Sequence, residues 1–140
     1  MSTAFVYNLP YAAKWASERI KGEGEFPEDT ATIGLMRDGK LVAVAVYTMY
    51  TGSGVMMSIA SDGSKRWMTK EFLRVCFEWP FNVLKCRRVT GVVRADLPEV
   101  QKFDEHLGFK KEGVIREGEE DGTDLILYGM LRSECRWITQ

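Results

Sequence analysis

Cysteine and histidine are scarce in this sequence. Its 140 residues include three cysteines and a single histidine, His106. The cysteines, Cys76, Cys86 and Cys135, form no CxxC pair, so neither a zinc site nor a secreted disulfide scaffold is expected. Ser-His-Asp and Cys-His mechanisms need a histidine as the base, so they are excluded here unless His106 takes that role. We therefore expect no metal, three free thiols, and a helix-surface position for His106.

A strong net charge and a long apolar run are also absent. Lys and Arg total 19 and Asp and Glu total 20, which gives a net charge of −1, whereas proteins that grip nucleic acid are usually basic. The longest apolar run, 41–50, is about half a membrane span. The N-terminus has no basic region followed by an apolar stretch, as a signal peptide would. The sequence thus indicates one cytoplasmic domain over 1–140, with neither a membrane nor nucleic acid as its expected partner.

What is present is an alternation of strands and amphipathic helices. Asp38-Gly39 between two apolar runs predicts a hairpin with a type I′ turn, and Pro80 is expected to end or kink a helix. Strands are expected at 4–9, 33–36, 41–50, 55–60, 88–94, 109–116 and 124–131, and helices at 10–21, from the turn at 61–64 to Trp79, and from 96–99 to 107. This order predicts an α/β fold whose mixed sheet of six or seven strands has about three helices on its two faces.

The segment from Arg88 to Arg116 carries the most specific pattern. A strand Arg-Arg-Val-Thr-Gly-Val-Val-Arg at 87–94 is followed by Leu-Gly-Phe at 107–109 and Glu-Gly-Val-Ile-Arg at 112–116. This order resembles the second half of the GNAT superfamily of N-acetyltransferases, in the branch of ribosomal-protein acetyltransferases and their small phage-encoded relatives. The closing strand at 124–130 fits that branch, and the resemblance covers about residues 30–135.

The resemblance implies that acetyl-CoA binds where the third meander strand separates from its neighbour. In the family a Gln/Arg-x-x-Gly-x-Gly/Ala loop cradles the pyrophosphate at a helix N-terminus. Here Ser64, Trp67 and Thr69 take those three positions, and we expect the Trp67 indole to pack under the helix with Phe72 and Leu73. The implied cofactor-binding residues are Ile59, Ala60, Ser61, Gly63, Ser64, Lys65, Arg66, Trp67, Met68, Thr69, Leu97 and Phe103. The alternative is an ordinary N-cap at 61–64 followed by a solvated basic first turn.

Catalytic candidates follow from the same resemblance and from general acid–base chemistry. Asp104 stands where the family often has a tyrosine acid, and it can act as an acid only if burial raises its pKa. An exposed polar helix face is the expected place for it. Asp62 and Glu112 are candidate bases, and Tyr128 is a candidate acid. Their alternatives are a loop cap, a surface charge and a core aromatic residue.

The resemblance implies transfer of an acetyl group from acetyl-CoA to an amine by direct attack in a ternary complex. An acyl-cysteine is not expected, because Cys76 lies in the apolar stripe of a helix. Two alternatives stay open: a non-catalytic CoA-binding or protein-interaction module, favoured by the off-pattern Trp67, Leu97 and Asp104, and a phage transferase that modifies a nucleobase. The acidic run at 117–121 indicates a hairpin tip or an attractor of a cationic acceptor. The resemblance also leaves a homodimer open.

Overall fold

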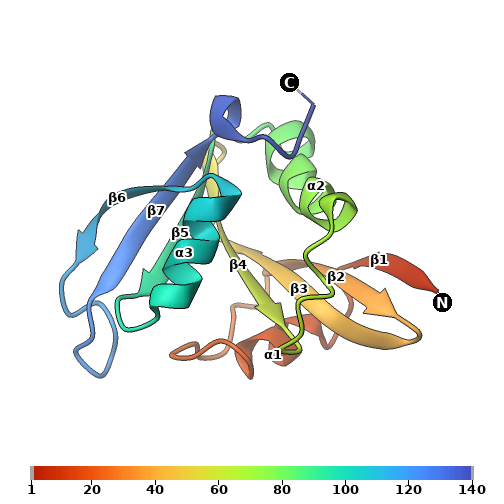
Figure 1. Cartoon of the computed structure of the whole chain (residues 1–140), viewed down its shortest axis with the longest axis horizontal. Coiled ribbons are helices and arrows are strands. Elements are labelled where there is room, and N and C mark those ends of the chain that lie inside the picture. Colours follow the sequence, from red (N-terminus) through yellow and green to blue (C-terminus); the bar gives the residue numbers. More distant parts are fainter. Residues whose placement is uncertain (1, 140) are drawn as a thin grey trace.

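A seven-stranded sheet with the order β1-β2-β3-β4-β5-β7-β6 forms the centre of the protein (Figure 1). The computed structural model describes residues 2–139. The strands are β1 (Thr3–Tyr7), β2 (Ala31–Arg37), β3 (Lys40–Thr48), β4 (Gly54–Ser61), β5 (Arg88–Arg94), β6 (Lys110–Ile115) and β7 (Leu125–Leu131). Among the strand pairs of residues 2–139, β4–β5 is parallel and the others are antiparallel. The predicted mixed sheet is confirmed.

The β2–β3 hairpin and the central position of β3 follow directly from the sequence. Asp38 and Gly39 have φ values of 51° and 80°, as a type I′ turn requires. The apolar residues of 41–47 are all buried, because β3 has helices on both of its faces. The strand ends at Thr48, two residues earlier than predicted, where Met49 takes a positive φ of 54°.

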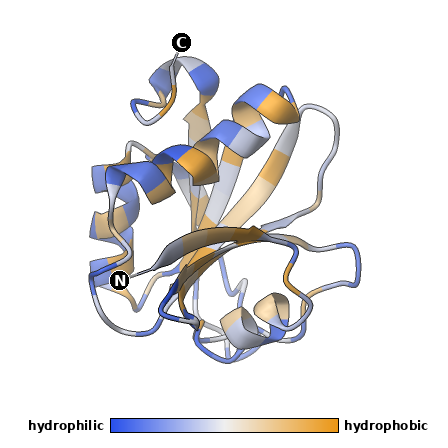
Figure 2. Ribbon diagram, turned by 90° about the vertical axis from the view of Figure 1, so that its right-hand side faces the viewer, coloured by the Kyte–Doolittle hydropathy of each residue, from blue (hydrophilic) through white to orange (hydrophobic). Residues whose placement is uncertain are grey.

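Three α-helices cover the sheet, one on one face and two on the other (Figure 2). Ala12 and Ala16 of the first helix pack in a cluster with Val44 and Val46. Phe72, Cys76 and other residues of the second and third helices share the larger core on the opposite face. The helices are α1 (Ala12–Ser17), α2 (Lys70–Glu78) and α3 (Pro98–Leu107), with a π-helical turn η1 (Trp79–Val83) and a 3-10 turn η2 (Arg132–Glu134).

Helix α2 begins later than the sequence pattern predicts. Residues 62–69 form a loop in which Gly63 has a φ of 93° and the Asp62 side chain accepts from the Ser64 N–H. Such side-chain bonds to the backbone compete with helix formation. Thr69 is the N-cap, and its hydroxyl accepts from the Phe72 N–H at 3.2 Å. The predicted N-cap at 61–64 and basic first turn are therefore wrong. Helix α1 is also shorter than the predicted 10–21.

The α-helix ends at Glu78, just before Pro80, as expected for a proline that ends or kinks a helix. Proline has no N–H for the carbonyl four residues earlier, which here belongs to Cys76. The buried Tyr47 hydroxyl donates to that Cys76 carbonyl at 2.5 Å. The chain continues as η1, in which the Leu84 N–H bonds the Trp79 carbonyl five residues back. The wider turn and the tyrosine together accommodate the proline.

Several smaller expectations are settled by burial. The three cysteines are free and buried, and His106 lies exposed on α3. Tyr47 and Met57 belong to the core, whereas Met49 and Tyr50 are 71% and 55% exposed, because they follow the end of β3. Within residues 2–139, no helix is long and apolar enough to cross a membrane.

The N-cap of α2 gives the first prediction. Thr69→Ala should lower the free energy of unfolding by about 1 kcal/mol, because the Phe72 N–H loses its acceptor. Thr69→Asp should restore most of the loss, since aspartate also caps. Urea denaturation measures both, with Thr139→Ala at an exposed position as the control. A Thr69→Ala protein as stable as the parent would contradict the cap.

Candidate functional site

The site begins where strands β4 and β5 separate. Their parallel pairing covers three residues of each strand and ends at Met56 and Thr90. Both strands continue, β4 to Ser61 and β5 to Arg94, and Figure 1 shows them diverging. Beyond Met56 and Thr90, the edges of β4 and β5 that face each other make no backbone pairing, and a space opens inside the sheet.

Backbone donors of β4 point into this space. The Asp62 N–H bonds the Val42 carbonyl of β3 at 2.9 Å. Because the bonds of an antiparallel pair recur at every second residue, Ala60 also pairs with β3, and Ile59 and Ser61 point toward β5. An N–H at the edge of such an opening can stabilise a developing oxyanion.

A cavity of about 100 Å³ occupies the gap between the strands. Ser58 and Val92 reach it on the α1 side of the sheet, whereas Met57 and Val93 reach it on the α2–α3 side, because neighbouring residues alternate faces. The cavity thus lies between the two faces. A cavity of roughly 150 Å³ holds benzene, so this one suits a short acyl group. It is lined by Ile20, Met57, Ser58, Ile59, Val92, Val93, Val100, Phe103, Asp104, Leu107 and Phe109.

Asp104 of α3 lines this cavity, so the expectation of an exposed polar face for it is wrong. The carboxylate lies over Gly91 of β5, where an added Cβ would be in van der Waals contact with its Oδ2 at 3.6 Å. Burial, and then the charge of Glu105, raise the pKa of Asp104 from 3.8 to about 7. A carboxyl that exists in both protonation states near neutral pH is suited to general acid–base catalysis.

Tyr128 of β7 lies on the same side of the sheet as Asp104. Its buried hydroxyl donates to Oε2 of Glu105 at 2.7 Å. Burial and this hydrogen bond raise the pKa of Tyr128 well above its usual range, and the Asp104 charge adds to the shift. The sequence did not point to Glu105, which links the two predicted residues. The structure thus brings Asp104 and Tyr128 together around one glutamate.

The two predicted bases, Asp62 and Glu112, lie elsewhere. Asp62 accepts from the Ser64 N–H at 2.9 Å and from its hydroxyl at 2.6 Å, and these bonds lower the pKa of Asp62. Glu112 of β6 forms an ion pair with Arg88 at 2.7 Å. Neither carboxylate lines the cavity between β4 and β5.

The loop before α2 presents unpaired donors and positive charge. Among residues 2–139, no acceptor pairs with the N–H groups of Lys65 and Trp67, or with those of Lys70 and Glu71 in the first turn of α2. The side chains of Lys65 and Arg66 are exposed. Unpaired N–H groups at a helix N-terminus attract anions, so these residues fit a pyrophosphate.

Trp67 places its indole in the interior, away from these donors. The residue is 8% exposed and shares the core cluster of Phe72 and Leu73, as the sequence predicted. Its ring contact, however, crosses to α3: the indole meets Phe103 edge-on, with ring centroids 5.1 Å apart. The aromatic pair connects the loop to α3 beside the cavity. Leu97 is the N-cap of α3 and packs against the same core.

Arg94 at the end of β5 fixes the acidic turn between β6 and β7. The residue is 7% exposed, and its guanidinium pairs with Asp96 at 2.9 Å, Glu119 at 3.2 Å and Asp121 at 2.8 Å. Asp96 engages Arg94 and does not cap α3, whose N-cap Leu97 makes no side-chain hydrogen bond. The acidic run is therefore held against the sheet, beside Gly22 of the α1–β2 connection.

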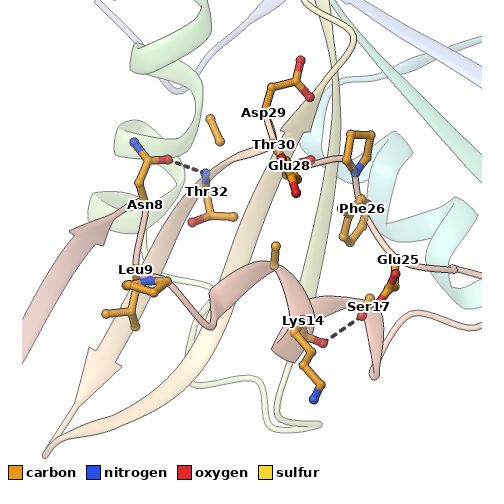
Figure 3. Close-up of a pocket in the computed structure, with 14 residues that line it drawn as sticks. Asn8, Leu9, Lys14, Ser17, Glu25, Phe26, Glu28, Asp29, Thr30 and Thr32 are labelled. Atoms are coloured by element: carbon orange, nitrogen blue, oxygen red, sulfur yellow. Dashed lines mark hydrogen bonds between the residues drawn. The ribbon is translucent and has the colours of Figure 1, made fainter.

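A larger hollow of about 720 Å³ lies between α1 and the segment 25–32 (Figure 3). In the wall of this hollow, Asn8 Oδ1 accepts a hydrogen bond from the Thr32 N–H at 3.0 Å. The carboxylates of Glu25, Glu28 and Asp29 also line the hollow. The hydroxyls of Thr30 and Thr32 are buried without a partner in the described chain. None of the predicted site residues lines this hollow.

Known structures with the same arrangement define the fold. No protein-family model and no curated protein matches the chain. A mutant spermidine N-acetyltransferase SpeG from Vibrio cholerae superposes with a TM-score of 0.76 at 10% identity, over 94% of each chain. A chimera of V. cholerae SpeG and hSSAT gives 0.73 at 12% identity, over 94% of this chain and 96% of that one. The chain has the GNAT acetyltransferase fold.

A third structure, assigned as an acetyltransferase of T. thermophilus, has a TM-score of 0.65 at 20% identity. The superposition covers 77% of this chain and 62% of the chain of that structure. These identities establish the fold alone. The narrower resemblance to ribosomal-protein and phage acetyltransferases stays a prediction.

The raised pKa of Asp104 predicts a pH-dependent stability. Between an unfolded pKa near 4 and the folded pKa of about 7 the folded state binds more protons, so stability falls as the pH rises. The fall should reach at most about 4 kcal/mol, and Asp104→Asn should abolish it. Urea denaturation from pH 4.5 to 8 measures the slope, with Glu99→Gln on the same helix as the control. Equal slopes in the parent and Asp104→Asn would mean that the carboxyl is solvated.

Proposed function

We propose that this protein is an N-acetyltransferase that transfers an acetyl group from acetyl-CoA to an amine in a ternary complex. One observation carries the proposal: the break in β4–β5 pairing brings backbone donors, an acyl-sized cavity and Asp104 to the same place. The GNAT fold supports it, and solved structures with this fold include spermidine N-acetyltransferases. The whole of 1–140 serves as one acyl-CoA-binding domain.

The residues present fit the cofactor at both of its ends. The N–H groups of Lys65 and Trp67 and the first turn of α2 would hold the pyrophosphate, with the Lys65 and Arg66 side chains adding charge. Phe103 and Ile59 would line the path into the cavity. Acetyl-CoA supplies an activated acyl group as a thioester.

The chemistry needs one proton to move from nitrogen to sulfur. The amine nitrogen attacks the thioester carbonyl, and the N–H of Ile59 donates to the oxygen that becomes negative. The Asp104 carboxylate accepts the proton that the nitrogen loses, because its pKa of about 7 leaves it partly ionised at neutral pH. The same carboxyl then donates this proton to the departing sulfur. The products are an amide and the free thiol of CoA.

The amine would arrive from the α1 side of the sheet. Ile20 and Ser58 reach the cavity on that side. The acidic turn held by Arg94 lies beside Gly22, and the pKa of Glu23 is raised by burial and by the charge of Glu119. This concentration of negative charge favours a cationic acceptor.

A second candidate is a CoA-binding module without catalysis. The contact between Trp67 and Phe103 favours it, because the indole stands at the position of the expected glycine and packs between the loop and α3. Amine-dependent release of CoA thiol separates the two functions. Binding of CoA without such release would support the module.

Cofactor binding is tested through the basic loop. Acetyl-CoA at 100 times its dissociation constant should stabilise the protein by about 2.7 kcal/mol. Lys65→Ala and Arg66→Ala should each weaken binding about tenfold or more, since a charge-assisted contact contributes roughly 1.5–3 kcal/mol. Calorimetry measures the affinities, and Lys40→Ala at the distant β2–β3 turn is the control. Unchanged affinity for acetyl-CoA in both loop variants would show that the pyrophosphate does not bind at this loop.

The role of Asp104 gives a kinetic prediction. Asp104→Asn should lower kcat by about 10²–10⁴-fold, the usual contribution of a general acid–base group, and leave the affinity for acetyl-CoA within a few-fold. The acidic limb of the pH–rate profile, near pH 7 in the parent, should disappear. Thiol release in the presence of an amine measures both, with Glu99→Gln as the control. Parent-like kcat in Asp104→Asn would assign the proton transfer to another group.

A further inference from the structure

The hollow of about 720 Å³ between α1 and the segment 25–32 contains two polar groups that the described chain leaves unsatisfied (Figure 3). Thr30 and Thr32 both line this hollow, and neither hydroxyl has a hydrogen-bond partner among residues 2–139. Thr32 is only 3% exposed. Buried hydroxyls in native proteins are normally paired, because an unpaired one is costly. The two threonines therefore point to a partner outside the described chain.

Both hydroxyls lie on the side of the sheet that faces the hollow. Ala31 and Ile33 pack in the larger core on the α2–α3 side, and neighbouring residues of a strand point to opposite faces. Thr30 and Thr32 therefore face α1. The Thr32 backbone is held by Asn8, whose Oδ1 accepts from the Thr32 N–H at 3.0 Å and whose N–H donates to the Thr32 carbonyl at 2.9 Å. The hollow thus has a fixed floor that carries two hydroxyls.

Three carboxylates, those of Glu25, Glu28 and Asp29, line the same hollow. All three residues are exposed, and no hydrogen bond or ion pair engages their side chains within residues 2–139. The lining also contains the cationic Lys14, and Figure 3 shows its side chain directed away from Glu28 and Asp29. The excess of negative charge favours a cationic ligand. A metal ion is not that ligand, because no group of three His, Cys, Asp or Glu residues in the described chain could hold one.

The rest of the lining is mostly apolar and belongs to the folded core. Leu9 and Phe26 line the hollow and pack against the cluster that contains Ala12 and Ala16 of α1. An ammonium group has three N–H donors and no acceptor, so it suits hydroxyl oxygens and carboxylates alike, and an aromatic face also attracts it. The hydroxyls, the apolar wall and the carboxylates together match a short alkyl chain that ends in an ammonium group.

This hollow is separate from the cavity that Asp104 lines. No residue lines both. Thr32 belongs to β2, and strands β3 and β4 lie between it and the opening beside β5. Neighbouring strands are about 4.8 Å apart, so the floor of the hollow is roughly 10 Å or more from that opening. An amine in the hollow is therefore not the nitrogen that would receive an acetyl group.

We propose that this hollow is a second ligand site, which binds a primary alkylammonium group. The ammonium donates to the hydroxyls of Thr30 and Thr32, the alkyl chain lies along Phe26, and the three carboxylates supply the opposing charge. A free amine and a lysine side chain both carry such a group, and two probes distinguish them. The inference goes beyond the proposed function and does not rest on it, because no residue of the acetyl site takes part.

The test is calorimetry on the full chain without acetyl-CoA, with n-pentylamine near neutral pH as the probe. The parent should bind pentylammonium at least about tenfold more tightly than n-pentanol, which has the same chain without the charge. Thr32→Val removes the hydroxyl and keeps the shape of the side chain, so it should weaken pentylammonium binding about tenfold. It should leave the free energy of unfolding unchanged or higher, since the hydroxyl has no partner in the described fold. Thr139→Val, at an exposed position, is the control.

The carboxylates are tested independently, at exposed residues whose replacement does not threaten folding. Glu28→Gln and Asp29→Asn should each weaken pentylammonium binding by a few-fold, whereas Glu99→Gln on α3 should not change it. Nα-acetyl-lysine amide is the second probe. If it binds at least as tightly as pentylammonium, the hollow is assigned to a lysine side chain, and if it binds more weakly, to a free amine.

Three results would overturn the inference: no binding of pentylammonium to the parent, equal affinity for n-pentanol, or parent-like affinity in Thr32→Val. If Thr32→Val does not fold, unchanged affinity in both Glu28→Gln and Asp29→Asn overturns it instead. None of these results bears on acetyl transfer. Asp104→Asn, which should lose activity, should bind pentylammonium as the parent does. Failure of the proposed function with intact binding of the probe would therefore leave the second site standing.

Discussion

The parallel ladder between β4 and β5 stops after three residue pairs, and the rest of the site depends on that interruption. A continued ladder would pair the edge of β4 that carries Ile59 and would fill the space that Asp104 lines. The neighbouring contacts keep the strands apart. Arg94 ties the far end of β5 to Asp96, Glu119 and Asp121, and β4 is paired along its other edge with β3. The sheet thus stays intact on both sides of an opening at its centre.

The carboxylates of this protein differ in role according to their bonding partners. Asp62, Glu112 and Asp96 are engaged by neighbouring donors or cations, so their charges organise loops and strand ends. Asp104 is half-buried, no cation pairs with it among residues 2–139, and desolvation therefore raises its pKa. Its carboxyl can therefore hold or release a proton near neutral pH, as the proposed proton transfer requires.

Much of the fold could be predicted from the sequence, because local patterns decide it. The apolar runs on either side of Asp38-Gly39 predicted the β2–β3 hairpin. The segment around Leu-Gly-Phe predicted the order of α3 and β6. The start of α2 could not be predicted: the apolar spacing extends back to Met68, but the hydrogen bonds of Asp62 hold that segment as a loop. The partial burial of Asp104 could not be predicted either, since its helix looks polar there and only the separated strands create the cavity.

The burial of the cysteines has a consequence for the handling of this protein. Burial raises the pKa of the Cys76, Cys86 and Cys135 thiols, and the thiolate is the form that reacts with alkylating agents and oxidants. The three lie in α2, just before β5 and just after η2, so each belongs to a different part of the molecule. Alkylation of any one of them therefore requires local opening. The order in which the three thiols become labelled would record the sequence in which these parts of the native structure come apart.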